Sequence, residues 1–322
     1  MKINDVLNGK WIVDNRVVLS CGVPGEWDDL AVYTPQVIED AGAYRMYYTG
    51  RDHDGEWRIG TATSEDLFNW TKHPEPVFAS GEDWDKQADF PWPIQANGKY
   101  YIYYEAKRIV GTPYPDDPIY GRWQGMTLLH MYTRSIGLAV SSDGIRFEKQ
   151  LRPVLTADPQ GKWDHNGICA SRVYPYEDGY IMFYAGSDTK RARTGVALSK
   201  DLINWTRYDN NPIIDTGESG DWDSLTVLFG SVLKLEDGYI AAYEGENGDY
   251  MQIGLAHSKY LFNWTKHTGN PIVRAEKPYH QFGTFVCAPN LLMKDGSLYL
   301  LYTHNLHFDG EGSQIEIAKL DA

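Results

Sequence analysis

A Trp-Asp pair recurs four times along this chain of 322 residues, and each copy opens a similar run of segments. The pairs stand at intervals of 57, 79 and 59 residues: Trp27-Asp28, Trp84-Asp85, Trp163-Asp164 and Trp222-Asp223. A repeat of this length indicates one structural unit copied along the chain, in which neighbouring copies bury one another's apolar faces. The repeat therefore constrains the fold more than any single motif does.

Each repeat has the pattern of antiparallel strands joined by tight turns. An apolar run follows the Trp-Asp pair, then a turn dipeptide, then an aromatic segment. The turn dipeptides are Ala41-Gly42, Asn97-Gly98, Asp178-Gly179, Asp237-Gly238 and, in a fifth copy, Asp295-Gly296. Such dipeptides between β-type runs are a strong hairpin signal. A third run and a short fourth run complete each unit, so each unit predicts four strands.

Four-stranded units in this number predict an all-β fold, a single five-bladed β-propeller over residues 1–322. The expected blades are roughly residues 30–78, 86–155, 165–214, 224–273 and 283–320. The fifth unit is one strand short. Val17–Leu19 precedes Trp27 by the interval at which Ile213-Ile214 precedes Trp222. We therefore expect residues 11–20 to complete the last blade and to close the ring.

Charge and apolar content exclude several classes of function. The chain has 44 Asp and Glu against 30 Lys and Arg, a net charge of −14, so a nucleic-acid backbone is not an expected partner. No run of eighteen apolar residues occurs, so no membrane partner is expected either. The first residues lack the apolar core of a signal peptide, which favours the cytoplasm unless a secretory leader precedes this chain. A small-molecule or oligosaccharide substrate fits; the sequence does not specify an oligomeric state.

The repeat resembles a known group of enzymes. The segments Tyr47–Gly50 (Tyr-Tyr-Thr-Gly) and Ala62–Trp70 (Ala-Thr-Ser-Glu-Asp-Leu-Phe-Asn-Trp) are similar to those of the five-bladed propeller glycosidases, the superfamily of glycoside hydrolase families 43, 32, 117 and 130. The resemblance implies a substrate at one mouth of the central channel and catalytic carboxylates at the start of the innermost strands. The positions of this chain that align with those carboxylates carry no acid: Thr34-Pro35, Phe90-Pro91, Ala170-Ser171, Phe229-Gly230 and Ala288-Pro289. The search for catalytic groups therefore moves to the loops.

Candidate catalytic residues are the polar loop positions at which one repeat departs from the others. They are Asp29, Asp89, Glu105, Glu244 and His165. Hydrolysis of a glycosidic bond needs one group that protonates the leaving oxygen and one that activates water or attacks carbon. We assign Asp29 as the base, Asp89 as an orienting or pKa-tuning carboxylate, and Glu105 or Glu244 as the acid. His165 is a rival acid, by resemblance to family 117. The aspartates of the four Trp-Asp pairs have a simpler interpretation as shared turn or capping residues.

Candidate substrate-binding residues are cations, aromatic side chains and one further histidine near the expected mouth. They are Arg172, Trp92, Arg51, Trp123 and His280. Trp92 and Trp123 could stack on sugar faces, with blade packing as the alternative for Trp92. Trp123 belongs to an insertion between Lys107 and Arg134, which is interpreted as a lid, a binding wall or a dimer contact.

Three hypotheses of function follow. The first is hydrolysis of a small or oligomeric carbohydrate, by inversion, as the resemblance to family 43 implies. The second is a family-130-like phosphorylase, favoured by a cationic set larger than a neutral sugar requires: Arg51, Lys107, Arg108, Arg172, Arg191 and Arg193. The third is a non-catalytic binding propeller, favoured by the missing acids of the innermost strands.

No cofactor is required by any of the three hypotheses. A structural calcium ion, known in some relatives, is compatible with the oxygen-rich loops, and no metal ligand is assigned. The three cysteines, Cys21, Cys169 and Cys287, predict neither a disulfide framework nor a zinc site.

Overall fold

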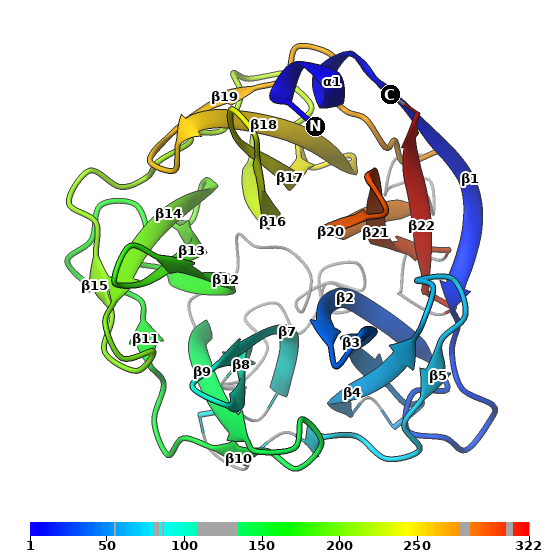
Figure 1. The fold of residues 1–322 in the computed structure, drawn as a ribbon. Coiled ribbons are helices and arrows are strands. Elements are labelled where there is room, and N and C mark those ends of the chain that lie inside the picture. The colour runs from blue at the N-terminus through cyan, green and yellow to red at the C-terminus, as the bar shows by residue number, and fades with distance from the viewer. Residues whose placement is uncertain are drawn as a thin grey trace, which may run out of the picture.

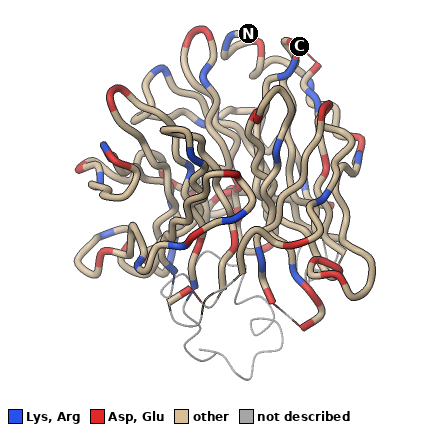
Figure 2. The backbone as a smooth tube through the Cα atoms, turned by 60° about the horizontal axis from the view of Figure 1, so that its bottom comes forward, with Lys and Arg blue, Asp and Glu red and all other residues tan. Residues whose placement is uncertain are grey.

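The computed structural model describes residues 1–54, 56–79, 81, 84–85, 87–107, 134–276, 284–306 and 312–321. Within these ranges the chain is all-β, as predicted, with one short helix, α1 (Ile3–Asn8). No helix of the described chain is long and apolar enough to cross a membrane. Figure 2 shows acidic and basic residues intermixed along the described loops.

The strands form five antiparallel groups that follow one another along the chain. The first group is β2 (Ala31–Asp40), β3 (Ala43–Arg51), β4 (Trp57–Ser64), β5 (Thr71–Lys72) and β6 (Phe78–Ala79). The second is β7 (Gln87–Ala96), β8 (Lys99–Lys107), β9 (Arg134–Ser141), β10 (Glu148–Lys149) and β11 (Leu155–Thr156). The third is β12 (Gly167–Tyr176), β13 (Gly179–Ser187), β14 (Ala192–Ser199) and β15 (Thr206–Arg207). The fourth is β16 (Thr226–Leu235), β17 (Gly238–Glu246), β18 (Met251–Tyr260) and β19 (Asn263–Lys266). The fifth is β20 (Phe285–Lys294), β21 (Ser297–Asn305), β22 (Gln314–Asp321) and β1 (Lys10–Leu19).

The five groups lie around a common centre, with β2, β7, β12, β16 and β20 nearest to it (Figure 1). A single parallel pair, Ala192 with Thr226, joins the third group to the fourth, so hydrogen bonding defines four sheets, one of them eight-stranded. These sheets do not join into one closed sheet. The closed ring therefore stays a prediction, and the all-β class is confirmed.

The N-terminal strand β1 pairs antiparallel with β22, for example Trp11 with Leu320, which is the pairing predicted for it. Helix α1 precedes it and buries Val6 in an apolar cluster that the fourth and fifth groups share. Residues from the two ends of the chain are thus held in the same part of the fold (Figure 1).

The repeated Trp-Asp pairs stabilise each group internally. Asp164 Oδ2 accepts hydrogen bonds from Tyr184 Oη at 3.1 Å and from Arg207 Nε at 2.8 Å. The Trp163 ring lies 5.3 Å from that of Tyr184 and covers Gly186 and Gly195, where an added Cβ would come within 2.6 Å and 2.3 Å of it. The same acid–tyrosine–cation set occurs three more times: Asp28 with Tyr48 and Lys72, Asp85 with Tyr104 and Lys149, and Asp223 with Tyr243 and Lys266. These four aspartates have a structural role.

Asp164→Ala is expected to lower the free energy of unfolding by about 2–4 kcal/mol, because it leaves a tyrosine hydroxyl and a partly buried guanidinium without their acceptor. Tyr184→Phe, which removes one neutral donor, should cost only about 1 kcal/mol. Urea unfolding followed by tryptophan fluorescence measures both values. Equal costs for the two variants would contradict a central role of the carboxylate.

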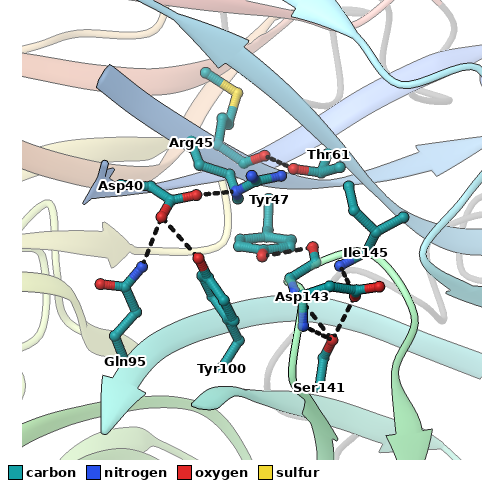
Figure 3. A network of polar contacts seen from close by, with 11 residues as sticks. Asp40, Arg45, Tyr47, Thr61, Gln95, Tyr100, Ser141, Asp143 and Ile145 are labelled. Atoms are coloured by element: carbon teal, nitrogen blue, oxygen red, sulfur yellow. Dashed lines mark hydrogen bonds and ion pairs between the residues drawn. The ribbon is translucent and has the colours of Figure 1, made fainter. Parts of the chain in front are cut away.

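Polar contacts also join neighbouring groups near the hairpin turns that follow their first strands. Asp40 of β2 accepts hydrogen bonds from Arg45 of β3 and, across the gap to the second group, from Gln95 and Tyr100, the last at 2.7 Å (Figure 3). In the same region Tyr47 donates to the Gly144 carbonyl at 2.9 Å. The first and second groups are therefore held together by side chains, since no backbone ladder connects them.

A β-bulge interrupts each of the five strands nearest the centre, and these are called the inner bulges below. The pairing register shifts at the residues Thr34, Phe90, Ala170, Gly230 and Ala288. The four that are not glycine have φ values between 49° and 55°. Backbone N–H groups at the bulges donate to side chains of the preceding group: Phe90 N to Thr49 Oγ1 at 3.1 Å, Ala288 N to Glu244 Oε2 at 3.1 Å and Thr34 N to Thr303 Oγ1 at 2.8 Å. The inner bulges thus connect neighbouring groups close to the centre.

Candidate active site

A cavity opens beside the inner bulges and draws its walls from the first, second, fourth and fifth groups. Its lining residues are Tyr33, Thr34, Thr49, Trp57, Asp89, Phe90, Arg134, Glu244, Met251 and Cys287. Wider clefts on the outer surface, such as the one beside Tyr176 and Lys200, are lined by strand ends and turns and contain no buried charge cluster. The central cavity is therefore the candidate active site.

The repeat explains which side chains reach this cavity. The second strand of each group ends with two inward positions, two residues apart, because alternate residues of a strand face the same side. The first position is Thr49, Glu105, Ala185, Glu244 and Thr303 in the five groups, and the second is Arg51, Lys107, Ser187, Glu246 and Asn305. Carboxylates occur at these positions only in the second and fourth groups.

The second group supplies four buried ionisable side chains. Lys107 Nζ lies 2.9 Å from Asp89 Oδ2 and 3.3 Å from Glu105 Oε1, and Arg134 Nε lies 3.1 Å from Glu105 Oε1. None of the four side chains is more than 6% exposed. Two carboxylates and two cations therefore neutralise one another in a low-dielectric environment, where each pair depends strongly on its partner.

Asp89 is the member of this set best arranged to exchange a proton. Burial, and next the charge of Glu105, raises the pKa of the Asp89 carboxyl to about 6, against the opposing effect of Lys107. Its Oδ1 is buried without a hydrogen-bond partner in the described part of the chain, while Oδ2 binds Lys107. A cavity-lining carboxyl with one unused oxygen and a pKa near neutrality has the properties of a general acid.

Glu244 and Glu246 form a second acidic pair, on the same face of β17. Burial raises the pKa of Glu244 to about 7, although the hydrogen bond from Ala288 N and the charge of Arg172 lower it. Burial and the charge of Glu244 raise the pKa of Glu246 to about 7 as well. Glu246 Oε2 accepts from Thr226 Oγ1 at 3.2 Å, and only Glu244 of the two lines the cavity.

Arg172 and Trp92, which were expected to contact substrate, are both buried in the core. Arg172 is fully buried and donates to the carbonyls of Gly230 at 2.5 Å and Ser171 at 2.9 Å. Its guanidinium lies 5.3 Å from the centre of the Trp92 ring. Trp92 is buried and donates through Nε1 to the Val173 carbonyl at 2.8 Å. Together the two residues connect the second, third and fourth groups. For Trp92 this corresponds to blade packing, the alternative to stacking on a sugar.

Asp29 and His165 belong to loops and do not line the central cavity. Asp29 Oδ2 accepts from Gly25 N at 2.7 Å, and Oδ1 lies 3.1 Å from His53 Nδ1. These hydrogen bonds, first the one from Gly25, lower the pKa of Asp29, which keeps it ionised. His165 is exposed beside Asp164. No contact in the described residues joins either side chain to Asp89 or Glu244.

Arg51 lies at the edge of the cavity. Its guanidinium is 5.4 Å from the centre of the Trp57 ring, and Lys107 Nζ is 5.6 Å from the same ring. Trp57 and Arg134 line the cavity, and Arg51 and Lys107 lie beside it through their contacts with the Trp57 ring. Trp123, His280 and the insertion between Lys107 and Arg134 lie outside the described residues.

Sequence reasoning did not select Arg134, Trp57 or Tyr33. The structure pairs Lys107 with Arg134, Arg51 with Trp57 and Thr49 with Tyr33 across adjacent strands. These three residues could have been identified from the strand register, as the cross-strand partners of the inward positions Lys107, Arg51 and Thr49. In the described residues, no three or more His, Cys, Asp or Glu side chains are grouped to hold a metal ion, and calcium stays an expectation.

Comparison with known proteins points to one family of the superfamily. The chain is 22% identical over 323 residues to a 1,2-β-oligomannan phosphorylase of Thermoanaerobacter sp. (strain X514), covering 96% of both chains. It is 31% identical over 131 residues to a β-1,2-mannobiose phosphorylase of the same organism, a match that spans 38% of this chain and only 39% of that protein.

Solved structures share the fold. A structure titled as a glycoside hydrolase has a TM-score of 0.70 at 22% identity, covering 95% of this chain and 92% of that one. A thermostable family-43 glycoside hydrolase has a TM-score of 0.65 at 17% identity, covering 94% and 96%. A third structure has a TM-score of 0.68 at 17% identity, covering 96% and 93%; its title states that family 130 of mannoside phosphorylases contains glycoside hydrolases that target β-1,2 mannosidic linkages in Candida mannan.

The family model described as β-1,4-mannooligosaccharide phosphorylase, that of glycoside hydrolase family 130, matches residues 126–321. This match corrects the expectation of a family-43-like enzyme. The superfamily expected from the repeat holds, since family 130 is one of its members. Because the model matches more than half of the chain, this protein belongs to glycoside hydrolase family 130.

Proposed function

We propose that this protein is a glycoside phosphorylase that cleaves a β-mannosidic linkage of an oligosaccharide at the central cavity, with inorganic phosphate as the attacking group. The family model and two mannoside phosphorylases among the relatives support this activity. They favour it over the hydrolysis first expected. We further propose that the five strand groups are the blades of one propeller with the cavity on its axis, which their arrangement in Figure 1 supports.

The observation that carries the proposal is the pairing of one unused acid with several cations at one cavity. Phosphorolysis needs a proton donor for the leaving oxygen and a cationic site for phosphate, and it needs no second carboxylate to activate water. Asp89 has the raised pKa and the unpartnered oxygen of such a donor. Arg134, Lys107 and Arg51 lie on or beside the cavity wall and suit a phosphate.

The proposed reaction is a single displacement. A phosphate oxygen forms a bond to the anomeric carbon as the glycosidic carbon–oxygen bond breaks, and Asp89 gives its proton to the departing oxygen. The products are a sugar 1-phosphate and a shortened oligosaccharide. Glu244, protonated or ionised near pH 7, would bind a sugar hydroxyl from the opposite wall of the cavity.

Hydrolysis is the second candidate, and one observation favours it. Asp89 and Glu244 line the same cavity with raised pKa values, so one could act as acid while the other activates water. The family-130 structure whose title names hydrolases supports the same possibility. Phosphate dependence separates the two activities.

We expect β-linked mannooligosaccharides to yield a sugar 1-phosphate only when inorganic phosphate is present, as followed by chromatography of the products. Asp89→Asn should abolish this product. The matched variant Asp29→Asn should retain most of it, because Asp29 is held ionised by Gly25 N and His53 outside the cavity.

Other outcomes identify the rivals. Free mannose formed equally with and without phosphate would establish hydrolysis. Loss of activity in Asp29→Asn with full activity in Asp89→Asn would assign the catalytic role to the loop residue Asp29. Sugar binding by calorimetry without any product would support a binding module.

A further inference from the structure

Four of the five inner bulges place a small residue at the centre of the fold, and one places a phenylalanine there. The small ones are Thr34, Ala170, Gly230 and Ala288; the exception is Phe90 of the second group. An aromatic ring at one of five equivalent positions can extend across the centre only when the others leave room for it. The set of residues at the inner bulges therefore points to a specific role for Phe90.

Phe90 reaches groups on the far side of the centre from its own strand. It packs against one apolar cluster of the third and fourth groups: Cys169, Ala170, Ala185, Ala192 and Leu228. It also packs against a cluster of the fourth and fifth groups: Met251, Phe285, Cys287 and Ala288. In Figure 1, β7 lies opposite β16 and β20 across the centre. Its side chain therefore reaches from the second group to residues of the third, fourth and fifth groups.

The backbone fixes this position. Phe90 has φ 51°, a region that costs energy for a bulky residue, and its N–H donates to Thr49 Oγ1 at 3.1 Å. Pro91 follows it and restricts the backbone further. Strained residues that the surrounding structure holds in place concentrate at functional sites. Phe90 also lines the cavity next to Asp89, and it is only partly buried, so part of its ring faces the cavity.

We propose that Phe90 is the specificity-determining residue of the cavity. Its ring is the apolar floor on which one face of the terminal sugar unit packs, and it prevents an oligosaccharide from continuing along the channel. The enzyme then acts on the last sugar unit only, held against Phe90 with its glycosidic oxygen towards Asp89. This inference rests on the proposed function. Sugars present apolar C–H faces that pack on aromatic rings, as pockets for small ligands commonly provide.

The test compares Phe90→Ala and Phe90→Leu with the wild type on β-linked mannobiose and mannotriose at saturating phosphate. Phe90→Ala should raise KM for mannobiose at least tenfold with a smaller change in kcat. The ratio of kcat/KM for mannotriose to that for mannobiose should rise at least fivefold, because the opened channel accepts the longer chain. Phe90→Leu, which keeps an apolar floor, should stay within threefold of the wild type. Phe147→Ala removes a partly buried ring from a different cluster and should change neither constant.

Unchanged KM values in Phe90→Ala would overturn the inference and leave the proposed function intact. A fall in kcat alone, or equal losses in Phe147→Ala, would show that Phe90 serves packing only. If the wild type turns over none of these sugars, the proposed function fails, and a second measurement still tests the closed floor. Phe90→Ala then leaves an apolar void between two clusters, and benzene should raise its Tm by several degrees without raising that of the wild type. No shift would refute the closure.

Discussion

Asp89→Asn is expected to lower kcat/KM for phosphorolysis by about 10²–10⁴-fold, the usual contribution of a positioned general acid. The change removes the only proton that the proposed mechanism delivers to the leaving oxygen. It keeps the size of the side chain and leaves an oxygen able to accept from Lys107. Steady-state kinetics with purified variants measure the loss. Asp29→Asn is the matched control, and circular dichroism confirms that both variants fold.

The pH profile of the wild type provides the stricter test. The pKa of Asp89 is raised to about 6, so the proton-carrying form prevails below that pH and declines above it. The acidic form is the active one, and kcat/KM should therefore fall as the pH rises through about 6. A fall centred near pH 7 that persists in Asp89→Asn and is lost in Glu244→Gln would instead identify Glu244 as the donor, since its pKa is about 7 and it lines the cavity.

Arg134→Met is expected to lower the free energy of unfolding by about 3–5 kcal/mol, the cost of removing one partner from a buried ion pair. The Arg134 and Glu105 side chains are 2% and 0% exposed, and their atoms Nε and Oε1 lie 3.1 Å apart. Methionine fills much of the same volume, so most of the loss should come from the Glu105 carboxylate, which keeps Lys107 as a cationic partner but loses Arg134. Urea unfolding of the variants measures it.

A double variant shows whether charge or packing is responsible. In Arg134→Met with Glu105→Leu no buried carboxylate remains beside position 134, so the double variant should recover at least half of the stability lost by Arg134→Met. If the losses in the free energy of unfolding of the two single variants simply add in the double variant, the two side chains contribute independently. The same variants should also bind phosphate more weakly than the wild type, because Arg134 lines the cavity.

The strand repeat could be predicted from sequence because it depends on local rules. Turn dipeptides and alternating aromatic residues set the hairpins, and the pairing of β1 with β22 followed from a missing strand. Asp89, Glu105 and Glu244 could be selected from the sequence because each departs from its equivalents in the other groups, and their catalytic roles stay predictions.

Arg172 and Trp92 are buried in the core for a reason that alternation does not address. The alternation of side chains along a strand shows which face of the strand a residue occupies. It does not show at which residue along the strand the cavity ends. Both residues follow the inner bulge of their strand: Trp92 pairs with Tyr103, and Arg172 pairs with Phe183. At these positions the next group packs against them. Arg134 was missed because it follows a long insertion. Its pairing with Lys107 is evident only from the strand register.

The contacts at the inner bulges also suggest how new chemistry can arise in this family. Thr49, Glu244 and Thr303 perform the same structural task, each accepting the N–H of a bulge in the next group. A hydroxyl and a carboxylate serve equally well as acceptors, but only the carboxylate has a second oxygen left over for a ligand. Exchange of threonine for glutamate at such a position would therefore add an acid to the centre without disturbing the fold.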